Sequence, residues 1–532
     1  MTAGALTEEV LTGTPTPFRN EEILDFAIPD NTRALLTALD EVRRQFGCEY
    51  DLAIGDMRLL TESKIVSINP ARPSEIIGVH QRATAEHVEA AMQVALAAFE
   101  SWRLRPAAGR AQVLFRAAKL ARERRFEFDA WLVAEVGKNW QEADADVAEM
   151  IDFMEYYGRE ALRLDAASTP IQFPGERNQL RYVPLGVGAM IPPWNYPFAI
   201  MAGMTAAALV CGNTAILKPS VDSPTIAVKF MELLRDAGLP EGVVTLCVGE
   251  GPEFGRALVA HPQTRFIAFT GSKAVGLEIH EAAAQTQPGQ IFLKRTILEL
   301  GGKDAIIVAD DCDLDLAVEG VVQSAFGFSG QKCSACSRAI VDQRIYEPFR
   351  DRLLERVKQI QVGDPAGNHF VGPVINERAH RRVLDYIAIG KTEGKLLAGG
   401  HPLETNEGGY YIAPTVIADV PPDARIAQEE IFGPVLALIK AKDFDDALAI
   451  ANGTEYGLTG GVFSASVEKL DKARLEFQVG NLYFNRKCTG AMVGAHPFGG
   501  FKMSGTDSKA GGPDYLLLFT QAKSIAEKVG TI

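Results

Sequence analysis

Cys333 is the residue of this sequence best suited to nucleophilic chemistry. It follows Gly327 and Gly330 in the segment 326–338, and glycines at these positions let the chain turn tightly. A cysteine is a strong nucleophile only when it is ionised, and a thiol with an ordinary pKa of about 8.5 is only a few per cent ionised at neutral pH. We expect a helix to begin near this segment and, together with Lys332, to shift the thiol toward thiolate.

The cysteines also allow other interpretations. Buried cysteines are usually small hydrophobic residues, and on its own each cysteine outside the segment fits that description: Cys48, Cys211, Cys247, Cys312 and Cys488. Cys333 and Cys336 form a CxxC pair, a pattern that also occurs in redox proteins and zinc sites. The sequence holds no second CxxC and no His-x-x-x-His nearby, so no metal site is predicted.

Glu299 is a candidate general base. It lies among apolar neighbours in the segment 297–300 and is followed by Gly301 and Gly302. A carboxylate held among apolar groups has a raised pKa, which suits general-base chemistry near neutral pH. An acid at the end of a strand that simply faces solvent would show the same local pattern.

The candidate dinucleotide site lacks the usual GxGxxG fingerprint. In the segment 269–276, Gly271, Ser272 and Gly276 follow a β-rich run and precede a helical stretch. A tight turn at a helix N-terminus presents backbone N–H groups to a pyrophosphate. Lys218 follows another short β-rich run and can reach ribose hydroxyls or phosphate. By pattern alone, an ordinary turn between a strand and a helix and a solvated lysine at a strand end are the more common explanations.

Alternating strands and helices must position these residues. An amphipathic helix is predicted around residues 88–99, and a longer helical region over 107–164. Short β-rich runs separated by helical stretches follow at 187–191, 214–217, 243–248, 266–270 and 305–308, with a second such series after residue 300. This alternation indicates parallel sheets covered by helices, and strands that are apolar on both faces are typical of buried parallel sheets.

The composition is that of an acidic globular protein. The 532 residues include 54 Lys and Arg against 68 Asp and Glu, a net charge of −14, and 47% of them are hydrophobic. General nucleic-acid binders are usually basic, and disordered chains are poorer in hydrophobic residues, so both classes are excluded. The 7 cysteines, an odd and sparse number, argue against a disulfide framework.

Neither a signal peptide nor a membrane span is expected. The first residues carry Glu8 and Glu9 and lack the basic and apolar regions of a signal peptide. Between Tyr182 and Leu217 no side chain is charged, but prolines and asparagines interrupt this stretch. We therefore interpret it as buried strands and a buried helix rather than a membrane span, and we expect a cytoplasmic protein.

Six motifs stand in the order seen in the aldehyde dehydrogenase superfamily, which the sequence resembles over residues 50–532. They are PWNYP (193–197), LKPS (217–220), FTGSKAVG (269–276), LELGGK (298–303), GQKC (330–333) and EEIFGPV (429–435). Segments 326–335, 485–491 and 497–506, and the segment 17–21, are similar to the branch that acts on 1-pyrroline-5-carboxylate, whose open form is L-glutamate γ-semialdehyde.

The resemblance implies catalytic roles. Cys333 is the nucleophile, and Glu299 is the base that activates water. The side-chain amide of Asn195 and the backbone N–H of Cys333 form an oxyanion hole, where losing one donor typically costs about 10²–10³ in rate. Because Glu299 is retained, hydrolysis to a free acid is favoured over transfer to coenzyme A.

The resemblance also implies NAD as the cofactor. The implied binding residues are Trp194 along the cleft, Lys218 and Ser220 near the adenosine ribose, Gly271, Ser272 and Gly276 near the pyrophosphate, and Glu430 and Phe432 near the nicotinamide ribose. Val221 departs from many NAD-specific members, which have Glu at this position to bind the ribose hydroxyls. Since valine cannot accept those hydrogen bonds, some use of NADP is expected.

For the substrate, the resemblance implies a cradle around the α-carboxylate. Ser334 and the backbone N–H groups of Gly490 and Ala491 would form it, and Phe498 would pack on the aliphatic part. Small residues at 490 and 491 allow close approach of the backbone. Without the resemblance, simple loop geometry would explain Ser334 and Gly490.

The implied fold is α/β, with a Rossmann-like NAD-binding domain, an α/β catalytic domain and a small β arm for oligomerisation. The expected parts are an N-terminal helical extension (1–50), the NAD-binding domain (51–164 and 183–297), the catalytic domain (298–505) and the arm (165–182 and 506–532). Within the extension, residues 21–46 have near-helical apolar spacing broken at Pro29. We expect residues 165–182 to form an exposed hairpin, and the apolar tail at 515–519 to pair with another part of the assembly.

The hypothesis is NAD-dependent oxidation of L-glutamate γ-semialdehyde to L-glutamate through a cysteine thiohemiacetal and thioester, in proline degradation. The chain has no room for a fused proline dehydrogenase and resembles the monofunctional form, as a homo-oligomer functionally coupled to a separate proline dehydrogenase. Three alternatives stay open: a dehydrogenase for another short semialdehyde such as succinate semialdehyde, a non-enzymatic scaffold with the same fold, and a CxxC redox or zinc protein.

Overall fold

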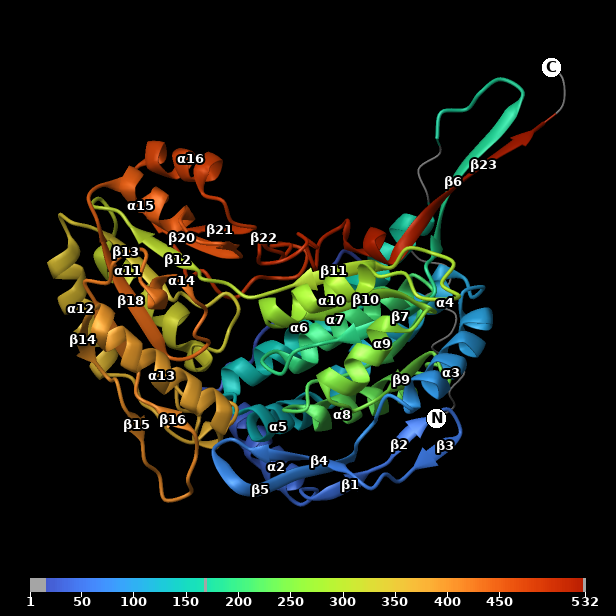
Figure 1. The fold of residues 1–532 in the computed structure, drawn as a ribbon, viewed down its shortest axis with the longest axis horizontal. Coiled ribbons are helices and arrows are strands. Elements are labelled where there is room, and N and C mark those ends of the chain that lie inside the picture. The colour runs from blue at the N-terminus through green and yellow to red at the C-terminus, as the bar shows by residue number, and fades with distance from the viewer. Residues whose placement is uncertain (1–15, 167–169, 530–532) are drawn as a thin grey trace.

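The computed structural model describes residues 16–166 and 170–529 and shows two α/β lobes with a projecting arm (Figure 1). The first lobe, blue to green, contains the N-terminal half of the chain, and the second, mainly yellow to orange, contains most of the C-terminal half. Parts of the predicted extension, arm and tail fall on residues 1–15, 167–169 and 530–532 and lie outside the described residues.

The chain enters the first lobe through an irregular segment, residues 16–28, followed by helix α2 (Pro29–Arg43). The helix begins at Pro29 because proline has the right φ for a first turn and needs no N–H partner there. The near-helical spacing at 21–28 is misleading, because this stretch is not helical. Its backbone N–H groups bond instead to carboxylates of a later helix, as at Glu21 and Leu24.

Two small β units follow α2. One is a sheet of order β1-β5-β4 and the other a hairpin of β2 with β3. Their strands are β1 (Cys48–Tyr50), β2 (Leu52–Ile54), β3 (Met57–Leu59), β4 (Lys64–Asn69) and β5 (Arg72–Gln81).

The predicted amphipathic helix and the longer helical region are confirmed. They correspond to α3 (His87–Trp102), α4 (Ala107–Glu123), α5 (Arg125–Val136) and α6 (Trp140–Asp165). Gly137 ends α5 at φ +72°, a conformation that favours glycine. Asn139 then caps α6 by accepting the N–H of Glu142.

The first lobe is built on five parallel strands in the order β11-β10-β7-β8-β9. The strands are β7 (Val187–Ile191), β8 (Thr214–Leu217), β9 (Val244–Leu246), β10 (Thr264–Thr270) and β11 (Arg295–Glu299), and the helices between them are α7 (Pro197–Val210), α8 (Pro224–Asp236), α9 (Arg256–Ala260) and α10 (Lys273–Ala284). β7 and β8 are entirely buried, as the apolar pattern predicts. The strand order reverses at β7, and such a reversal opens a crevice at the carboxyl ends of the strands.

The second lobe is built on seven strands in the order β14-β17-β18-β13-β12-β20-β21, of which only β14 is antiparallel to its neighbour. The strands are β12 (Ala305–Val308), β13 (Arg338–Asp342), β14 (Lys395–Ala398), β17 (Thr415–Ala418), β18 (Val435–Ala441), β20 (Thr459–Phe463) and β21 (Asn481–Phe484). The helices are α11 (Leu314–Phe326), α12 (Tyr346–Lys358), α13 (Glu377–Glu393), α14 (Arg425–Gln428), α15 (Phe444–Asn452) and α16 (Val467–Glu476). Two short pairs complete it, β15 (Pro402–Leu403) with β16 (Tyr411–Ile412) and β19 (Tyr456–Gly457) with β22 (Phe501–Lys502).

The arm is formed by two segments far apart in sequence, β6 (Glu176–Pro184) and β23 (Thr520–Lys528), which pair antiparallel along their whole length. The expected exposed hairpin is therefore wrong, because β6 pairs with the C-terminal strand. The tail Tyr515–Phe519 also differs from expectation. It forms a short helical turn in which Tyr515, Leu516 and Phe519 are buried in the core of the first lobe.

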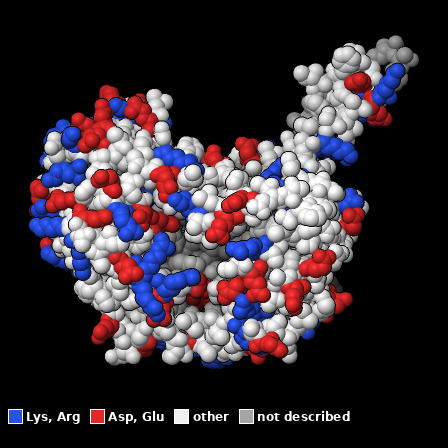
Figure 2. Space-filling model, viewed as in Figure 1, with Lys and Arg blue, Asp and Glu red and all other residues white. Residues whose placement is uncertain are grey.

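Charges of both signs are interspersed over the face of the molecule drawn in Figure 2. Within residues 16–166 and 170–529, no helix is long and apolar enough to cross a membrane.

Candidate active site

The residues proposed for chemistry meet where the two lobes join. β11 ends at Glu299, and the chain passes directly from there into the second lobe. Asn195, Lys218 and Gly271 follow the carboxyl ends of β7, β8 and β10, and Cys333 lies just before β13. Parallel strands place their carboxyl ends along one edge of a sheet, and ligands bind in the crevice at that edge.

A constrained turn precedes Cys333. Phe328, Ser329 and Gly330 have consecutive positive φ values of +50°, +56° and +68°. This conformation costs about 1–2 kcal/mol for a residue that has a Cβ atom, so tertiary contacts must hold it in place. A Cβ atom on Gly330 would lie 2.3 Å from the carbonyl oxygen of Gly433, so the close approach of the two segments requires glycine.

The state of the Cys333 thiol differs from the prediction. Burial, with a further contribution from the Asp304 charge, raises its pKa instead of lowering it. α11 ends at Phe326, before the loop, so Cys333 does not lie at the N-terminus of that helix. The Lys332 ammonium lies 2.6 Å from Oε1 of Glu142. Lys332 therefore forms an ion pair with Glu142 instead of stabilising the thiolate of Cys333, as the sequence predicted. The thiol is therefore protonated in the protein without substrate.

Glu299 has the environment of a general base. Its Oε1 accepts hydrogen bonds from the hydroxyl of Ser508 and from the Ser508 backbone N–H at 3.4 Å. Its Oε2 is buried and has no partner among the described residues. Burial raises the pKa of Glu299 to about 8, although the bonds from Ser508 oppose the shift. A free carboxylate oxygen with a pKa near the working pH is what proton abstraction requires.

Asn195 is buried beside the nucleophile loop. Its Nδ2 donates to the carbonyl oxygen of Gln331 at 3.1 Å, and Oε1 of Gln331 in turn accepts the N–H of Ile375 at 2.9 Å. In the described part of the chain, the backbone N–H of Cys333 has no hydrogen-bond acceptor. An amide side chain and a backbone N–H at the nucleophile are the donors of an oxyanion hole.

The helix N-terminus at Ser272 is open on the same side of the sheet. Ser272 is the N-cap residue of α10 and makes no side-chain capping bond. A Cβ atom on Gly276 would lie 2.2 Å from the side chain of Leu300, so glycine lets α10 pack closely against the end of β11. A Cβ atom on Gly271 would meet the ring of Phe269 at 2.5 Å. Uncapped N–H groups at such a turn suit an anionic phosphate.

Lys218 lies buried at the end of β8, with Ser220 in the following turn. Its Nζ donates to the carbonyl oxygen of Pro219 at 3.0 Å, and burial lowers its pKa to about 8. The Ser220 hydroxyl accepts the N–H of Asp222 at 3.2 Å. Val221 is half-buried in the same turn.

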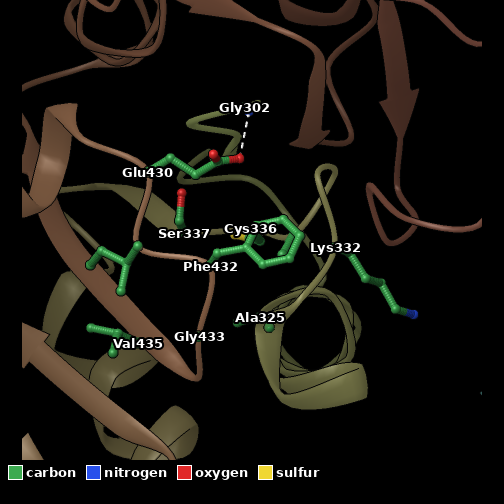
Figure 3. Close-up of a pocket in the computed structure, with 12 residues that line it drawn as sticks. Gly302, Ala325, Lys332, Cys336, Ser337, Glu430, Phe432, Gly433 and Val435 are labelled. Carbon is green, nitrogen blue, oxygen red and sulfur yellow. Dashed lines mark hydrogen bonds between the residues drawn. The ribbon is translucent and has the colours of Figure 1, made fainter. Parts of the chain in front are cut away.

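Glu430 and Phe432 line a small cavity of about 20 Å³ (Figure 3). Oε1 of Glu430 accepts the backbone N–H of Gly302 at 3.0 Å. Phe432 has φ +61°, and its ring meets Trp194 edge-on at a centroid distance of 5.5 Å. The carboxylate can accept hydrogen bonds from ribose hydroxyls, and the aromatic side chains beside it can pack against a flat ring.

Ser334 and the loop that carries Gly490 and Ala491 are held together by Cys488. Sγ of Cys488 donates to the carbonyl oxygen of Ser334 at 3.3 Å. Among the described residues, neither backbone N–H of Gly490 and Ala491 has an acceptor, and the Ser334 hydroxyl makes no hydrogen bond. Gly490 has φ +75°. Phe498 follows this loop and is held by paired backbone bonds to Ala510 at 2.8 and 2.7 Å.

The chain matches the model of the "Aldehyde dehydrogenase family" over residues 60–525. The protein belongs to the aldehyde dehydrogenase family. A relative from Geobacillus thermodenitrificans, named 1-pyrroline-5-carboxylate dehydrogenase, is 56% identical over 512 residues, which cover 96% of this chain and 99% of that protein.

Solved structures of aldehyde dehydrogenases share the fold. A point mutant of Thermus thermophilus 1-pyrroline-5-carboxylate dehydrogenase is 53% identical and superposes with a TM-score of 0.95, covering 97% of this chain and 100% of that one. A 1-pyrroline-5-carboxylate dehydrogenase from Thermus with bound NAD is 52% identical, with the same TM-score and coverage. The prediction of an aldehyde dehydrogenase fold is therefore confirmed.

The structure also shows a polar cluster of Glu142, Tyr196 and Lys332 that the sequence did not predict. Besides Lys332, Glu142 binds the hydroxyl of Tyr196, which donates to Oε2 at 2.8 Å. Burial opposes ionisation of Glu142, but Lys332 outweighs it and lowers the pKa to about 2. Tyr196 lies in the PWNYP motif, next to Asn195. Glu142 gave no local signal, because Lys332 is 190 residues away in sequence.

Ser508, which binds Glu299, was also missed, since a lone serine in a glycine-rich tail has no distinctive pattern. The CxxC partner Cys336 is buried, and its Sγ donates to the carbonyl oxygen of Arg338 at 3.4 Å. Burial and the neighbouring Cys488 raise the pKa of Cys336. In the described ranges, no group of three or more His, Cys, Asp or Glu side chains is arranged to hold a metal ion.

Proposed function

We propose that this aldehyde dehydrogenase oxidises L-glutamate γ-semialdehyde, the open form of 1-pyrroline-5-carboxylate, to L-glutamate with NAD as the oxidant. The observation that carries the proposal is the set of free donors at Ser334, Gly490 and Ala491, joined to the nucleophile loop. An α-carboxylate satisfies these donors, and Lys487, whose Nζ would lie 3.7 Å from a Cβ atom on Gly490, lies beside them. The names of the full-length relatives support the same substrate.

The first step is addition of Cys333 to the aldehyde. The Cys333 thiol gives its proton to solvent water, Sγ bonds to the aldehyde carbon, and the carbonyl oxygen becomes an oxyanion as the C=O π bond breaks. Nδ2 of Asn195 and the backbone N–H of Cys333 stabilise that charge. Donors held by a rigid loop need no reorganisation as the charge forms, which is why they accelerate the step.

The residues at the sheet edge fit a dinucleotide. Lys218 and Ser220 would bind the adenosine ribose. The open N-terminus of α10 at Ser272 would bind the pyrophosphate together with Gly271 and Gly276. Glu430, Phe432 and Trp194 would bind the nicotinamide end. When bound, NAD accepts the hydride that leaves the adduct carbon, which converts the adduct to a thioester. Val221, in the turn that would face the adenosine ribose, cannot accept hydrogen bonds from the ribose hydroxyls. The proposal therefore includes some use of NADP.

The second half-reaction is hydrolysis of the thioester on Cys333. Oε2 of Glu299 takes a proton from water, and the resulting hydroxide attacks the carbonyl carbon. Collapse of the tetrahedral intermediate breaks the C–S bond, releases L-glutamate and returns the sulfur as thiolate. The same oxyanion donors stabilise this second intermediate.

Asn195→Ala is expected to lower kcat by about 10²–10³ with a smaller change in KM, because the amide binds the oxyanion and not the ground-state aldehyde. Steady-state NADH formation from 1-pyrroline-5-carboxylate measures this effect. Asn406→Ala is the control, because Asn406 is exposed and lies between β15 and β16. Asn213 is not suitable, because it is buried and its side chain binds backbone groups. An unchanged kcat in Asn195→Ala would remove this residue from the mechanism.

The experiment that tests the proposed function compares three aldehydes in parallel. NADH formation is followed from 1-pyrroline-5-carboxylate, succinate semialdehyde and propanal with the wild-type protein. We expect kcat/KM to be far higher for the first, since only that substrate presents an α-amino acid carboxylate to the donors of Ser334, Gly490 and Ala491. Equal values for all three would show that Ser334, Gly490 and Ala491 do not select the substrate, and a preference for succinate semialdehyde would identify the alternative activity.

Gly490→Leu is expected to raise KM for the semialdehyde by about tenfold or more while leaving that for propanal nearly unchanged. The side chain would occupy the space where the carboxylate meets the backbone, and φ +75° strains any residue other than glycine. Gly408, also at positive φ and in open space between β15 and β16, supplies the matched variant Gly408→Leu. Equal increases for both aldehydes would contradict a carboxylate contact at this position.

The division of labour among the parts is also proposed. Residues 51–164 and 183–297 would bind NAD, and residues 298–505 would carry out catalysis. Residues 165–182 and 506–532 would form an arm for homo-oligomerisation. We place the enzyme in the cytoplasm, in the second step of proline degradation, functionally coupled to a separate proline dehydrogenase.

A further inference from the structure

The extension contains a strap, residues 16–28, that has no role in the proposed chemistry. It runs along α6 and is held by side chains of that helix. The carbonyl oxygen of Thr16 accepts Nε–H of Arg159 at 2.9 Å, and the backbone N–H of Leu24 donates to Oδ2 of Asp144 at 2.7 Å. Phe26 is buried and meets the ring of Trp140 at 5.6 Å.

Asn20 connects this strap to a distant part of the chain. Its Nδ2 donates to Oδ2 of Asp152 on α6 at 2.8 Å and to the carbonyl oxygen of Val493 at 2.9 Å. The other carboxylate oxygen of Asp152 accepts the backbone N–H of Glu21 at 2.7 Å. Asp152 and Val493 are both buried and Asn20 is half-buried, so the two bonds are partly shielded from water. Hydrogen bonds to a buried carboxylate are stronger than those between neutral groups.

Phe18 makes a second contact with the same region. Its ring meets Tyr156 of α6 edge-on at 5.1 Å. A Cβ atom on Gly494 would lie 3.2 Å from the Phe18 ring, so the backbone at Gly494 packs directly on this phenylalanine. The strap therefore contacts two consecutive residues of one loop, Val493 and Gly494.

That loop, the cradle loop (residues 488–496), carries Gly490 and Ala491. Its first residue is fixed by two bonds, from the N–H of Cys488 to Oγ of Ser324 at 3.1 Å and from its Sγ to Ser334. At its far end, the N–H of Gly494 donates to the carbonyl oxygen of Gly511 at 2.8 Å. Val493 lies two residues beyond Ala491. Among the described residues, only the strap donates a hydrogen bond to its carbonyl oxygen.

We infer that Asn20 is a positioning residue for the substrate carboxylate. By joining Val493 to Asp152, it holds the cradle loop in the conformation that leaves the N–H groups of Gly490 and Ala491 free to bind the carboxylate. The N-terminal strap thereby sets selectivity for a carboxylate-bearing aldehyde without touching the substrate. This inference rests on the proposed function, because it assumes that the cradle loop binds the carboxylate.

The test is Asn20→Ala, assayed with 1-pyrroline-5-carboxylate and with propanal. We expect KM for the former to rise about tenfold, with kcat and the kcat/KM for propanal within about twofold of wild type. Asn31→Ala is the matched control, because Asn31 lies on α2 and, among the described residues, its Nδ2 donates only to the nearby carbonyl oxygen of Asp25. An unchanged KM, or an equal loss for both aldehydes, would overturn the inference.

A second readout separates this inference from the proposed function. Hydrogen exchange of Met492 and Gly494, whose N–H groups donate to Nδ1 of His496 and to the carbonyl oxygen of Gly511, is compared between wild type and Asn20→Ala, both without substrate. Faster exchange in the variant supports the strap contact, and unchanged exchange overturns it, whichever aldehyde the wild type prefers. If Asn20→Ala does not fold, Phe18→Leu, which weakens the packing on Gly494, is judged by the same kinetic and exchange criteria.

Discussion

Cys333→Ala is expected to reduce NADH formation from any aldehyde by about 10⁴-fold or more. Cys333 is the thiol that the motifs and the loop geometry place at the junction of the two lobes, and without covalent addition no adduct forms from which hydride can leave. Losses of this size are typical when the nucleophile of a covalent mechanism is removed. The measurement is steady-state and single-turnover NADH formation from 1-pyrroline-5-carboxylate and from propanal.

Cys312→Ala provides the control for this prediction. It removes a partly buried thiol of the same lobe that follows β12 and packs against the lobe's core outside the site. Its activity should stay close to that of wild type. NAD binding by the Cys333→Ala variant should also persist, which shows that the site is intact. Turnover above about one hundredth of wild type in Cys333→Ala would exclude the covalent mechanism.

Glu299→Gln is expected to lower steady-state turnover by up to about 10⁴-fold while preserving one rapid turnover. Glutamine keeps the shape of the side chain and can still accept bonds from Ser508, but it cannot take a proton from water. Acylation then releases one equivalent of NADH per site before the thioester accumulates. A rapid-mixing experiment distinguishes the burst from the steady state, and mass spectrometry detects the acylated Cys333.

The control for Glu299→Gln is Glu281→Gln, an exposed position on α10 that should leave both phases unchanged. Loss of the burst together with the steady state would contradict the assignment, since Glu299 would then be required for acylation as well.

The pKa of Glu299 also fixes the direction of the pH dependence. A base acts in its ionised form, and a pKa of about 8 leaves roughly one tenth of Glu299 ionised at pH 7. Thioester hydrolysis should therefore speed up as pH rises through about 8 and then level off. This rise should be missing from the residual hydrolysis by Glu299→Gln. A flat profile for the wild type from about pH 6 to about pH 9 would contradict a base with a raised pKa.

The sequence by itself determined much of the framework. Apolar runs on both faces predicted the buried strands β7 and β8, and the spacing of Val88 and Met92 predicted α3. The order of six short motifs identified the family. These features are readable because periodicity and local turn chemistry depend on residues close together in sequence. The catalytic, cofactor and substrate roles drawn from the motifs stay predictions until the variants are measured.

Other parts of the fold were decided by contacts between distant segments. β6 pairs with β23 rather than folding into a hairpin, and the apolar tail at Tyr515–Phe519 fills the core of its own lobe. An apolar or alternating run shows that a segment needs a partner, but not which one. The strap has helix-like apolar spacing but is not helical, because carboxylates of α6 accept hydrogen bonds from its backbone N–H groups.

The electrostatics of the site depended most strongly on the tertiary structure. The sequence predicted an ionised Cys333 assisted by Lys332, but folding buries the thiol and pairs Lys332 with Glu142. A pKa is set by burial and by charges within a few ångströms, and Glu142 and Lys332 come from elements 190 residues apart in sequence. The sequence therefore determined which residues are present to do chemistry. The packing of the two lobes decided which of them are charged, which are free to bind, and that an N-terminal strap supports the loop carrying Gly490.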